Sequence, residues 1–462
     1  MATVSIAPAR PRRLLEIMLM FAALAVGVGG YVLTSINRTG EAPADLVQHV
    51  IILVVVAIIA EVGVHFLAPY ADPVILPVSV ALTGLGLAMI HRLDLSYAAL
   101  GEPTVGMRQL LFVGLAIAVA AFILIGVKDH RKLRRFTYSF GALSVILLLL
   151  PMVPFLGRET FGARVWIRLG PLSLQPGELV KITLAIFFAG YLVANRDNLA
   201  IGGRKILGLR LPRLRDLGPI MVIWLMGLAI LILQRDLGTS LLLFGLFVAM
   251  LYVATNRVSW LLIGFALFVP AVAVAIRIFP HVAGRFDAWL NALDPQMYER
   301  EFGGSYQLVQ SFFGQASGGL MGTGWGRGYP QLVPLANSDF ILSSLAEELG
   351  LTGLFAILLL YLILIERGMR AAIGVRDGFG KLLATGLSFS LALQLFVVLG
   401  GVSGLIPLTG LTAPFLAAGG SSMLSSWITV ALLMRVSDAA RRPAAVVPWN
   451  GEAPNDQAGD GQ

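Results

Sequence analysis

Twelve long apolar runs, separated by polar or charged segments, dominate the pattern of the chain. Each run is close to the roughly 20 residues that an α-helix needs to cross the hydrocarbon core of a bilayer, whereas membrane barrel strands would alternate apolar and polar positions. The pattern therefore predicts an all-α fold, a polytopic membrane bundle of about 12 transmembrane helices. The predicted spans are 14–34, 47–68, 74–91, 108–127, 138–156, 179–195, 218–233, 239–255, 259–279, 339–365, 379–400 and 412–434.

The composition also indicates a membrane protein. Of 462 residues, 57% are apolar and 13% are charged, and the mean hydropathy is +0.83. A water-soluble globule of this composition would lack the polar residues that cover its surface. The absence of cysteine excludes a disulfide framework and a thiolate metal site. We attribute the formal net charge of +8 to membrane orientation, so no nucleic acid partner is expected.

Basic residues are distributed unevenly among the segments that join the predicted spans. They concentrate in 128–135, 196–215 and 367–381, which the twelve-span count places on the same side as the basic N-terminal segment 1–13. Because lysine and arginine favour the cytoplasmic side, both termini are predicted to be cytoplasmic. The first apolar run is too long for a signal-peptide core and is interpreted as a retained span.

The chain is predicted to form one membrane domain (14–436) between a cytoplasmic N-terminus (1–13) and a disordered cytoplasmic tail (437–462), whose residues have nothing to bury. The longest interval between spans, about 280–338, falls on the outer side and carries several aromatic residues and glycines. We expect short amphipathic helices at the membrane interface there, with glycine turns between them. The glycine runs lack the Lys-Ser/Thr ending of a P-loop, which argues against nucleotide binding.

Charged residues gather beside apolar runs on the predicted outer face. Such residues are costly near lipid unless they are paired or hydrated, which makes them candidates for a site. The set is Arg164, Arg168, Glu178, Lys181, Asp294, Glu347 and Glu348, with the aromatic Trp166 among them.

Each candidate also has a purely structural interpretation. Glu178 and Lys181 are three residues apart and share a helix face, so they either form a salt bridge that only holds the bundle or line a site. For Glu347 and Glu348 the hydrated or paired helix end is favoured over chemistry.

The second predicted span contains Glu61 and His65, which are four residues apart. A buried structural pair is favoured there over a proton relay.

Six motifs occur in order along the chain: Gly162-Ala163-Arg164 with Trp166-Ile167; Gln175-Pro176 with Glu178 and Lys181; Asp236-Leu237-Gly238-Thr239; Tyr306-Gln307 with Gln310-Ser311; Asp339-Phe340-Ile341 with Glu347-Glu348-Leu349-Gly350; and Pro407-Leu408-Thr409-Gly410 with Gly419-Gly420-Ser421-Ser422. Together they resemble the SEDS family (shape, elongation, division and sporulation), of the RodA/FtsW type. The resemblance covers roughly 139–436. Upstream segments 69–73 and 89–94 are similar to the RodA-type branch of actinobacteria, which has two spans beyond the usual ten. Gly177 and Arg235 depart from the family pattern without touching a carboxylate.

The resemblance implies a peptidoglycan glycosyltransferase of the bacterial cytoplasmic membrane, which polymerises lipid II into glycan strands at the outer face during elongation or division. It implies that Asp294 is the catalytic aspartate and that Glu178 and Lys181 are paired residues lining the cavity. It also implies a class B penicillin-binding protein as the transpeptidase partner, besides membrane lipids.

Transfer of a sugar from a diphosphate requires a base for the acceptor hydroxyl and cations for the leaving group, so one carboxylate and basic residues suffice. We assign Arg164 and Arg168 as the diphosphate contacts on this argument alone. No cofactor is firmly implied and no metal ligands are assigned, although the chemistry leaves room for a divalent cation at the diphosphate.

Two other classes remain as alternatives. A lipid II flippase or transporter would also be a bundle with intramembrane charges, but its functional residues would gather at the midplane and not at the outer rim. In a non-catalytic cell-wall scaffold, Asp294 would have no functional role.

Overall fold

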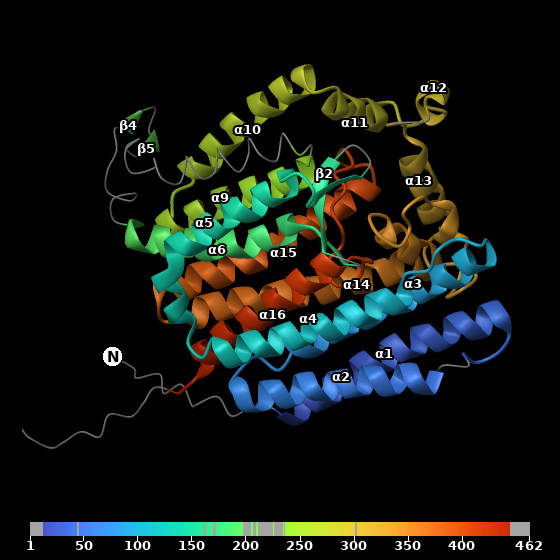
Figure 1. Ribbon diagram of the computed structural model, residues 1–462, viewed down its shortest axis with the longest axis horizontal. Helices are drawn as coiled ribbons and strands as arrows, with labels where there is room; N and C mark the ends of the chain where they lie inside the picture. The colour runs from blue at the N-terminus through green and yellow to red at the C-terminus, as the bar shows by residue number, and fades with distance from the viewer. Residues whose placement is uncertain are drawn as a thin grey trace, which may run out of the picture.

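The structure, a computed structural model, describes a helical bundle with a small amount of sheet (Figure 1). The described residues are 13–43, 46–160, 163–169, 172–196, 205–206, 209–210, 225, 234, 236–300 and 303–443.

Ten helices in the described part of the chain are long and apolar enough to cross a membrane. Most of them lie side by side in Figure 1, with α1 and α2 at one edge and α10 splayed from the opposite edge. They are α1 (Arg13–Thr39), α2 (Leu46–Leu67), α3 (Ile75–Ala99), α4 (Gly106–Gly126), the continuous η1–α5–η2 segment (His130–Phe136, Thr137–Leu149, Leu150–Met152), α6 (Pro176–Ala194), α9 (Leu237–Thr255), α10 (Ser259–Ile278), α14 (Ile341–Gly374) and α15 (Gly378–Val402).

An eleventh helix of the bundle, α16 (Gly420–Arg441), corrects the last predicted span. The apolar run from 412 does not start a helix, because 412–419 folds as a loop that includes Phe415 in a left-handed conformation. The helix also continues to Arg441, so the predicted disordered tail cannot begin at 437. The predicted span 218–233 and the rest of the tail, 444–462, lie outside the described residues, apart from the isolated residue 225.

Helix boundaries follow local capping chemistry. The Asp236 side chain caps α9 by accepting hydrogen bonds from the backbone N–H of Thr239 at 3.0 Å and from its hydroxyl at 2.6 Å. The Asp377 side chain caps α15 by accepting from the Gly380 N–H at 2.7 Å. Acceptor side chains at these positions satisfy backbone donors that have no partner within the helix.

Close helix packing depends on small residues where α1 crosses α3. A Cβ atom added at Gly27 would lie 2.9 Å from the Gly84 Cα, so the two backbones meet at a distance that only glycine permits. Small residues at helix crossings allow this approach in membrane bundles.

One end of the bundle, here named the loop end, carries the irregular elements. A three-stranded antiparallel sheet of β1 (Gly157–Thr160), β2 (Ala163–Leu169) and β3 (Leu172–Leu174) precedes α6, and the sequence analysis did not anticipate it. The predicted short helices of 280–338 are α11 (Pro280–Leu290), α12 (Pro295–Tyr298) and α13 (Tyr306–Gly318), followed by η3 (Pro330–Leu332). A separate hairpin, β4 (Lys205–Ile206) and β5 (Leu209–Arg210), lies on the opposite side of the view in Figure 1, at the upper left.

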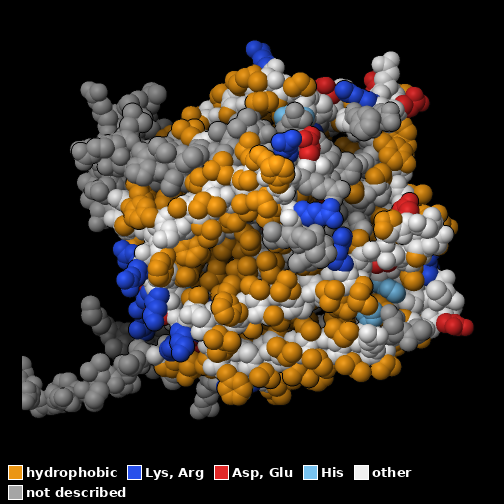
Figure 2. All heavy atoms as spheres, in the orientation of Figure 1, with side chains coloured by type: hydrophobic (Ala, Val, Ile, Leu, Met, Phe, Trp, Pro, Cys, Tyr) orange, Lys and Arg blue, Asp and Glu red, His pale blue; other side chains and the backbone are white. Residues whose placement is uncertain are grey.

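The surface matches a bilayer environment. Figure 2 shows a broad apolar face over the helices, with Lys and Arg side chains gathered at the left edge, opposite the loop end. Described basic residues at that edge, here named the basic end, include Arg131 of η1 and Arg370 of α14, both exposed.

Glu61 and His65 do not form the pair that we favoured. Instead, Arg13 of α1 donates to His65 Nε2 at 2.7 Å. The Glu61 Oε2 atom is buried without a hydrogen-bond partner in the described structure. The basic side chain of the neighbouring helix therefore replaces the local i,i+4 contact that the sequence suggested.

Candidate functional site

Glu178 and Lys181 form a buried ion pair in the first turns of α6. Lys181 Nζ lies 2.6 Å from Glu178 Oε2 and donates to Gln394 Oε1 of α15 at 2.7 Å. The Ser425 hydroxyl of α16 donates to Glu178 Oε2 at 2.8 Å. Gln394 Nε2 donates to the Thr412 carbonyl at 2.9 Å. The predicted pair therefore exists and ties three helices and one loop together.

A second charged cluster adjoins this pair. Arg285 of α11 donates to the carbonyl of Thr409 at 2.9 Å and of Leu408 at 3.3 Å, and it interacts electrostatically with Asp236 and Asp339. Burial raises the pKa of both carboxyls and lowers the pKa of Arg285, while the opposite charges counteract these shifts. All three side chains are partly exposed.

The sequence analysis assigned no role to the residues of this cluster. Asp236 and Asp339 belong to motifs of the resemblance, and both stand where an outer segment meets a predicted span. That position was a usable signal for a site, because carboxylates at the end of an apolar run require a partner or water. The signal for Arg285 was weaker, since a single arginine in an amphipathic segment is common.

Asp294 is exposed at the loop end, apart from the buried network. It is the N-cap of α12, and its Oδ1 accepts from the Gln296 N–H at 2.9 Å. No described contact joins it to Glu178 or Lys181, and α12 lies at the far edge of the view from α6 (Figure 1). Asp294 thus caps a short helix, as an ordinary turn residue would, and its carboxylate remains accessible to a substrate.

Arg164 and Arg168 lie on β2 with exposed side chains. The β1–β2 register shifts opposite the stretch between them, so simple strand alternation does not place both side chains on one face of the sheet. Arg164 Nε lies 3.1 Å from Glu159 Oε2 of β1, and this exposed pair contributes little to stability. The sheet is anchored to the bundle where the Gln175 N–H donates to the Ser421 hydroxyl at 2.7 Å.

Glu347 and Glu348 have the structural role that was favoured for them. Arg92 Nε of α3 lies 2.6 Å from Glu348 Oε1, and both side chains are fully buried. Arg92 also donates to the Gly328 carbonyl at 2.7 Å, while Glu347 Oε1 accepts from the Tyr329 N–H at 2.6 Å. The two glutamates therefore fix the loop that follows α13.

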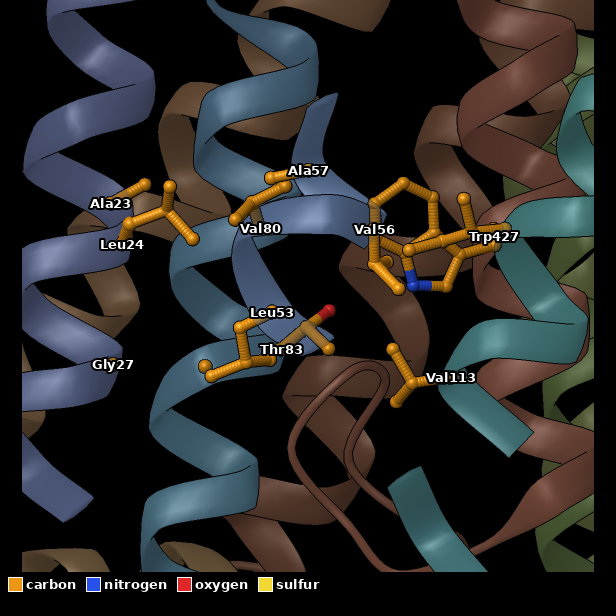
Figure 3. A pocket seen from close by; sticks show the side chains of 12 residues that line it. Ala23, Leu24, Gly27, Leu53, Val56, Ala57, Val80, Thr83, Val113 and Trp427 are labelled. Atoms are coloured by element: carbon orange, nitrogen blue, oxygen red, sulfur yellow. The ribbon is translucent and has the colours of Figure 1, made fainter. Parts of the chain in front are cut away.

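An apolar cavity of about 30 Å³ lies between the α1–α2 hairpin and the rest of the bundle. Among the side chains drawn in Figure 3, only the Thr83 hydroxyl and the Trp427 indole nitrogen are polar. The cavity thus has no group suited to acid–base chemistry. In addition, no group of three or more His, Asp or Glu side chains that could hold a metal ion occurs in the described part of the chain.

Comparison with known proteins places these features in a family. The family of cell cycle proteins FtsW, RodA and SpoVE matches residues 73–442, which extends beyond the segment that carried the resemblance. The "peptidoglycan glycosyltransferase RodA" of Mycobacterium tuberculosis is 44% identical over 97% of this chain and 96% of its own length, and that of Mycobacterium leprae is 41% identical over 97% and 95%.

A solved structure described as "structural coordination of polymerization and crosslinking by a peptidoglycan synthase complex" contains a similar chain. Its TM-score is 0.64 at 27% identity, and the match covers 80% of this chain and 98% of that one. The family match leaves α1 and α2 outside its range, whereas the mycobacterial relatives match almost the whole chain. The chain belongs to the FtsW/RodA/SpoVE family, the SEDS family of peptidoglycan glycosyltransferases.

Proposed function

We propose that this protein polymerises lipid II into glycan strands at the outer face of the bacterial cytoplasmic membrane. The observation that carries the proposal is that a charged surface and an apolar surface meet at the loop end. An accessible carboxylate and two exposed arginines stand there beside helices whose outward faces are apolar. Such a site suits a substrate that has a sugar, a diphosphate and a lipid tail. The names of the mycobacterial relatives support the same class of activity.

The proposed chemistry assigns one task to each group. Asp294 takes the proton of the acceptor hydroxyl as that oxygen attacks the anomeric carbon, and the bond to the diphosphate breaks. Arg164 and Arg168 bind the departing diphosphate, which leaves as an anion and needs cations and no acid. Glu178 and Lys181 form the wall that holds the site. A divalent cation at the diphosphate would have to be bound mainly by the substrate, since the described residues offer no cluster of ligands.

The proposal includes an orientation. The loop end faces outward and both termini are cytoplasmic, because the basic end carries the exposed lysines and arginines of η1 and of the α14–α15 turn. The predicted membrane domain, 14–436, is extended to Arg441, where its C-terminal helix ends.

A class B penicillin-binding protein is the proposed partner. One similar chain of known structure belongs to a peptidoglycan synthase complex described as coordinating polymerization and crosslinking. Within its described residues, this chain has only short elements outside the bundle, too few to form a separate crosslinking domain. A transpeptidase in the same membrane would supply the second activity.

Incubation of the purified protein with lipid II, with and without the transpeptidase, tests the proposal. Glycan polymer that appears with the wild-type protein and is absent with Asp294→Asn supports it. Movement of lipid II across vesicle leaflets without polymer would favour the flippase, and neither activity in the presence of the partner would favour a scaffold.

A further inference from the structure

On its N-terminal side, the segment that bears Asp294 is fastened to the bundle by two side chains of α11. Trp289 Nε1 of α11 donates to the Gly404 carbonyl at 2.7 Å, and Arg285 donates to the carbonyls of Leu408 and Thr409. All three acceptors belong to the loop between α15 and α16, here named the 403–419 loop. Helix α11 is therefore held against this loop by two side-chain donors one helical turn apart.

The same loop is bonded to the buried ion pair. Gln394 donates to the Thr412 carbonyl while it accepts from Lys181, so Thr412 is tied to the Glu178–Lys181 pair through one side chain. The stretch from Leu408 to Thr412 thus contacts Arg285 at its start and Gln394 at its end. It is a covalent link of a few residues between the two charged clusters.

Arg285 is suited to hold a fixed geometry. Its planar guanidinium presents several N–H donors in a rigid fork, and it reaches two successive carbonyls. Asp236 and Asp339 compensate its charge, which a partly buried arginine requires. Asp236 stands at the start of α9 and Asp339 just before α14, so the guanidinium interacts with carboxylates at the starts of two separate helices.

The Asp294 side chain makes no described contact outside its own short helix. Its side chain is exposed, and the hydrogen bond to the Gln296 N–H lies within its own short helix. The segment around it is closed by the Ser305 hydroxyl, which donates to the Ala292 carbonyl at 2.6 Å. Ala292 also packs with Leu308 and Val309 of α13 in a small apolar cluster, so the position of the Asp294 carboxylate relative to the bundle depends on α13 and on how α11 is anchored.

We infer that Arg285 is a positioning residue, which anchors α11 to the 403–419 loop and thereby sets where the Asp294 carboxylate stands relative to the Glu178–Lys181 pair. The inference rests on the proposed function, in which Asp294 is the base. Misplacement of a reacting group by about 1 Å can cost on the order of 100-fold in rate. Arg285 thus acts on the chemical step without touching the substrate.

The first test compares Arg285→Gln and Arg285→Lys with the wild type in the lipid II polymerisation assay. Arg285→Gln should lower kcat by roughly 10- to 100-fold with KM within about twofold. Arg285→Lys keeps the charge between Asp236 and Asp339 and should recover part of the loss. The control is Arg300→Gln, an exposed arginine nearby in sequence, which should remain active. A kcat of Arg285→Gln equal to wild type would overturn the inference.

A double-mutant cycle separates positioning from general instability. Asp294→Glu keeps a carboxylate but moves it by one methylene, so its rate already reflects a displaced base. If Arg285 acts through Asp294, the loss in the combined variant will be smaller than the product of the two single losses. If the rate loss in the combined variant equals the product of the two single losses, the inference is contradicted. It is also contradicted if the loss of activity only matches the loss of folded protein measured by size-exclusion chromatography. Should Arg285→Gln fail to fold, the same cycle is run with Arg285→Lys.

The outcomes also distinguish this inference from the proposed function. Full activity of Asp294→Asn would remove the base on which both rest. Loss of activity in Asp294→Asn together with normal kcat in Arg285→Gln and Arg285→Lys would overturn the positioning role alone.

Discussion

Lys181 Nζ lies 2.6 Å from Glu178 Oε2, one helical turn away on α6, and both side chains are buried within the bundle. Gln394 and Ser425 satisfy further hydrogen-bonding positions of the pair. An ion pair in such surroundings is well compensated, and its two members depend on each other. Removal of one partner leaves a charge that water cannot reach.

The buried Glu178–Lys181 ion pair leads to a prediction about stability. Glu178→Gln and Lys181→Met should each lower the free energy of unfolding by about 3–5 kcal/mol, because each leaves an uncompensated buried charge. The charge swap Glu178→Lys with Lys181→Glu should restore part of that loss. Thermal denaturation in detergent measures the effect, and Glu159→Gln in the exposed pair with Arg164 is the control, at less than about 1 kcal/mol. A swap no better than the single variants would favour a direct substrate role for one member.

Acid stability at the basic end depends on Asp377. Burial acts against its charge, but the hydrogen bonds from His130 and from the Gly380 N–H, with the nearby charge of Arg131, outweigh burial and hold the pKa at about 2, below the ordinary 3.8. A lowered pKa stabilises the folded state above the ordinary value, and this stabilisation is lost as pH falls through about 2.

The stability difference between wild type and Asp377→Asn should therefore be largest above about pH 4 and shrink toward pH 2. Melting temperatures across this range measure it. A difference independent of pH would show that the Asp377 charge is not the stabilising feature.

The orientation can be tested by labelling, because the chain has no cysteine of its own. Ala316 near the end of α13 and Lys132 in η1 are both exposed and lie at opposite ends of the bundle. A cysteine at Ala316 should react with an impermeant maleimide from outside the cell, and one at Lys132 only after permeabilisation. The reverse pattern would contradict the proposed topology.

The exposed arginines of β2 should affect substrate binding. If Arg164 and Arg168 contact the diphosphate, replacing both with Gln should lower kcat/KM by roughly 10- to 100-fold, the loss expected for two charge-assisted hydrogen bonds. Arg135→Gln, at the basic end, removes a cation without affecting the loop end and should leave kcat/KM unchanged. An unchanged kcat/KM in the β2 double variant would show that the diphosphate binds elsewhere.

Much of the fold could be predicted because lipid imposes a length on each apolar run. The prediction was wrong where an apolar segment is buried in the protein as a loop and does not start a membrane-spanning helix. The run from 412 is apolar, yet 412–419 packs as a loop in which the Ala418 N–H donates to the Asn337 carbonyl. The sheet before α6 was missed because its strands are short and carry charged side chains.

The candidate site was only partly predictable, for a related reason. The Glu178–Lys181 pair is local, so helical periodicity was enough to predict it. Arg92 and Glu348 are 256 residues apart, and no periodicity brings them together. Arg285 and its acceptors in the 403–419 loop, Leu408 and Thr409, are 123 and 124 residues apart, and these contacts also depend on tertiary packing.

Asp294→Asn in the lipid II polymerisation assay tests the central claim most directly. Asn can retain the cap on the Gln296 N–H but cannot accept a proton, so folding and partner binding should persist while polymer formation falls by about 100-fold or more. Asp287→Asn, an exposed aspartate seven residues earlier, should remain active. Near-normal polymerisation by Asp294→Asn would contradict the account and make Glu178 the next candidate for the base.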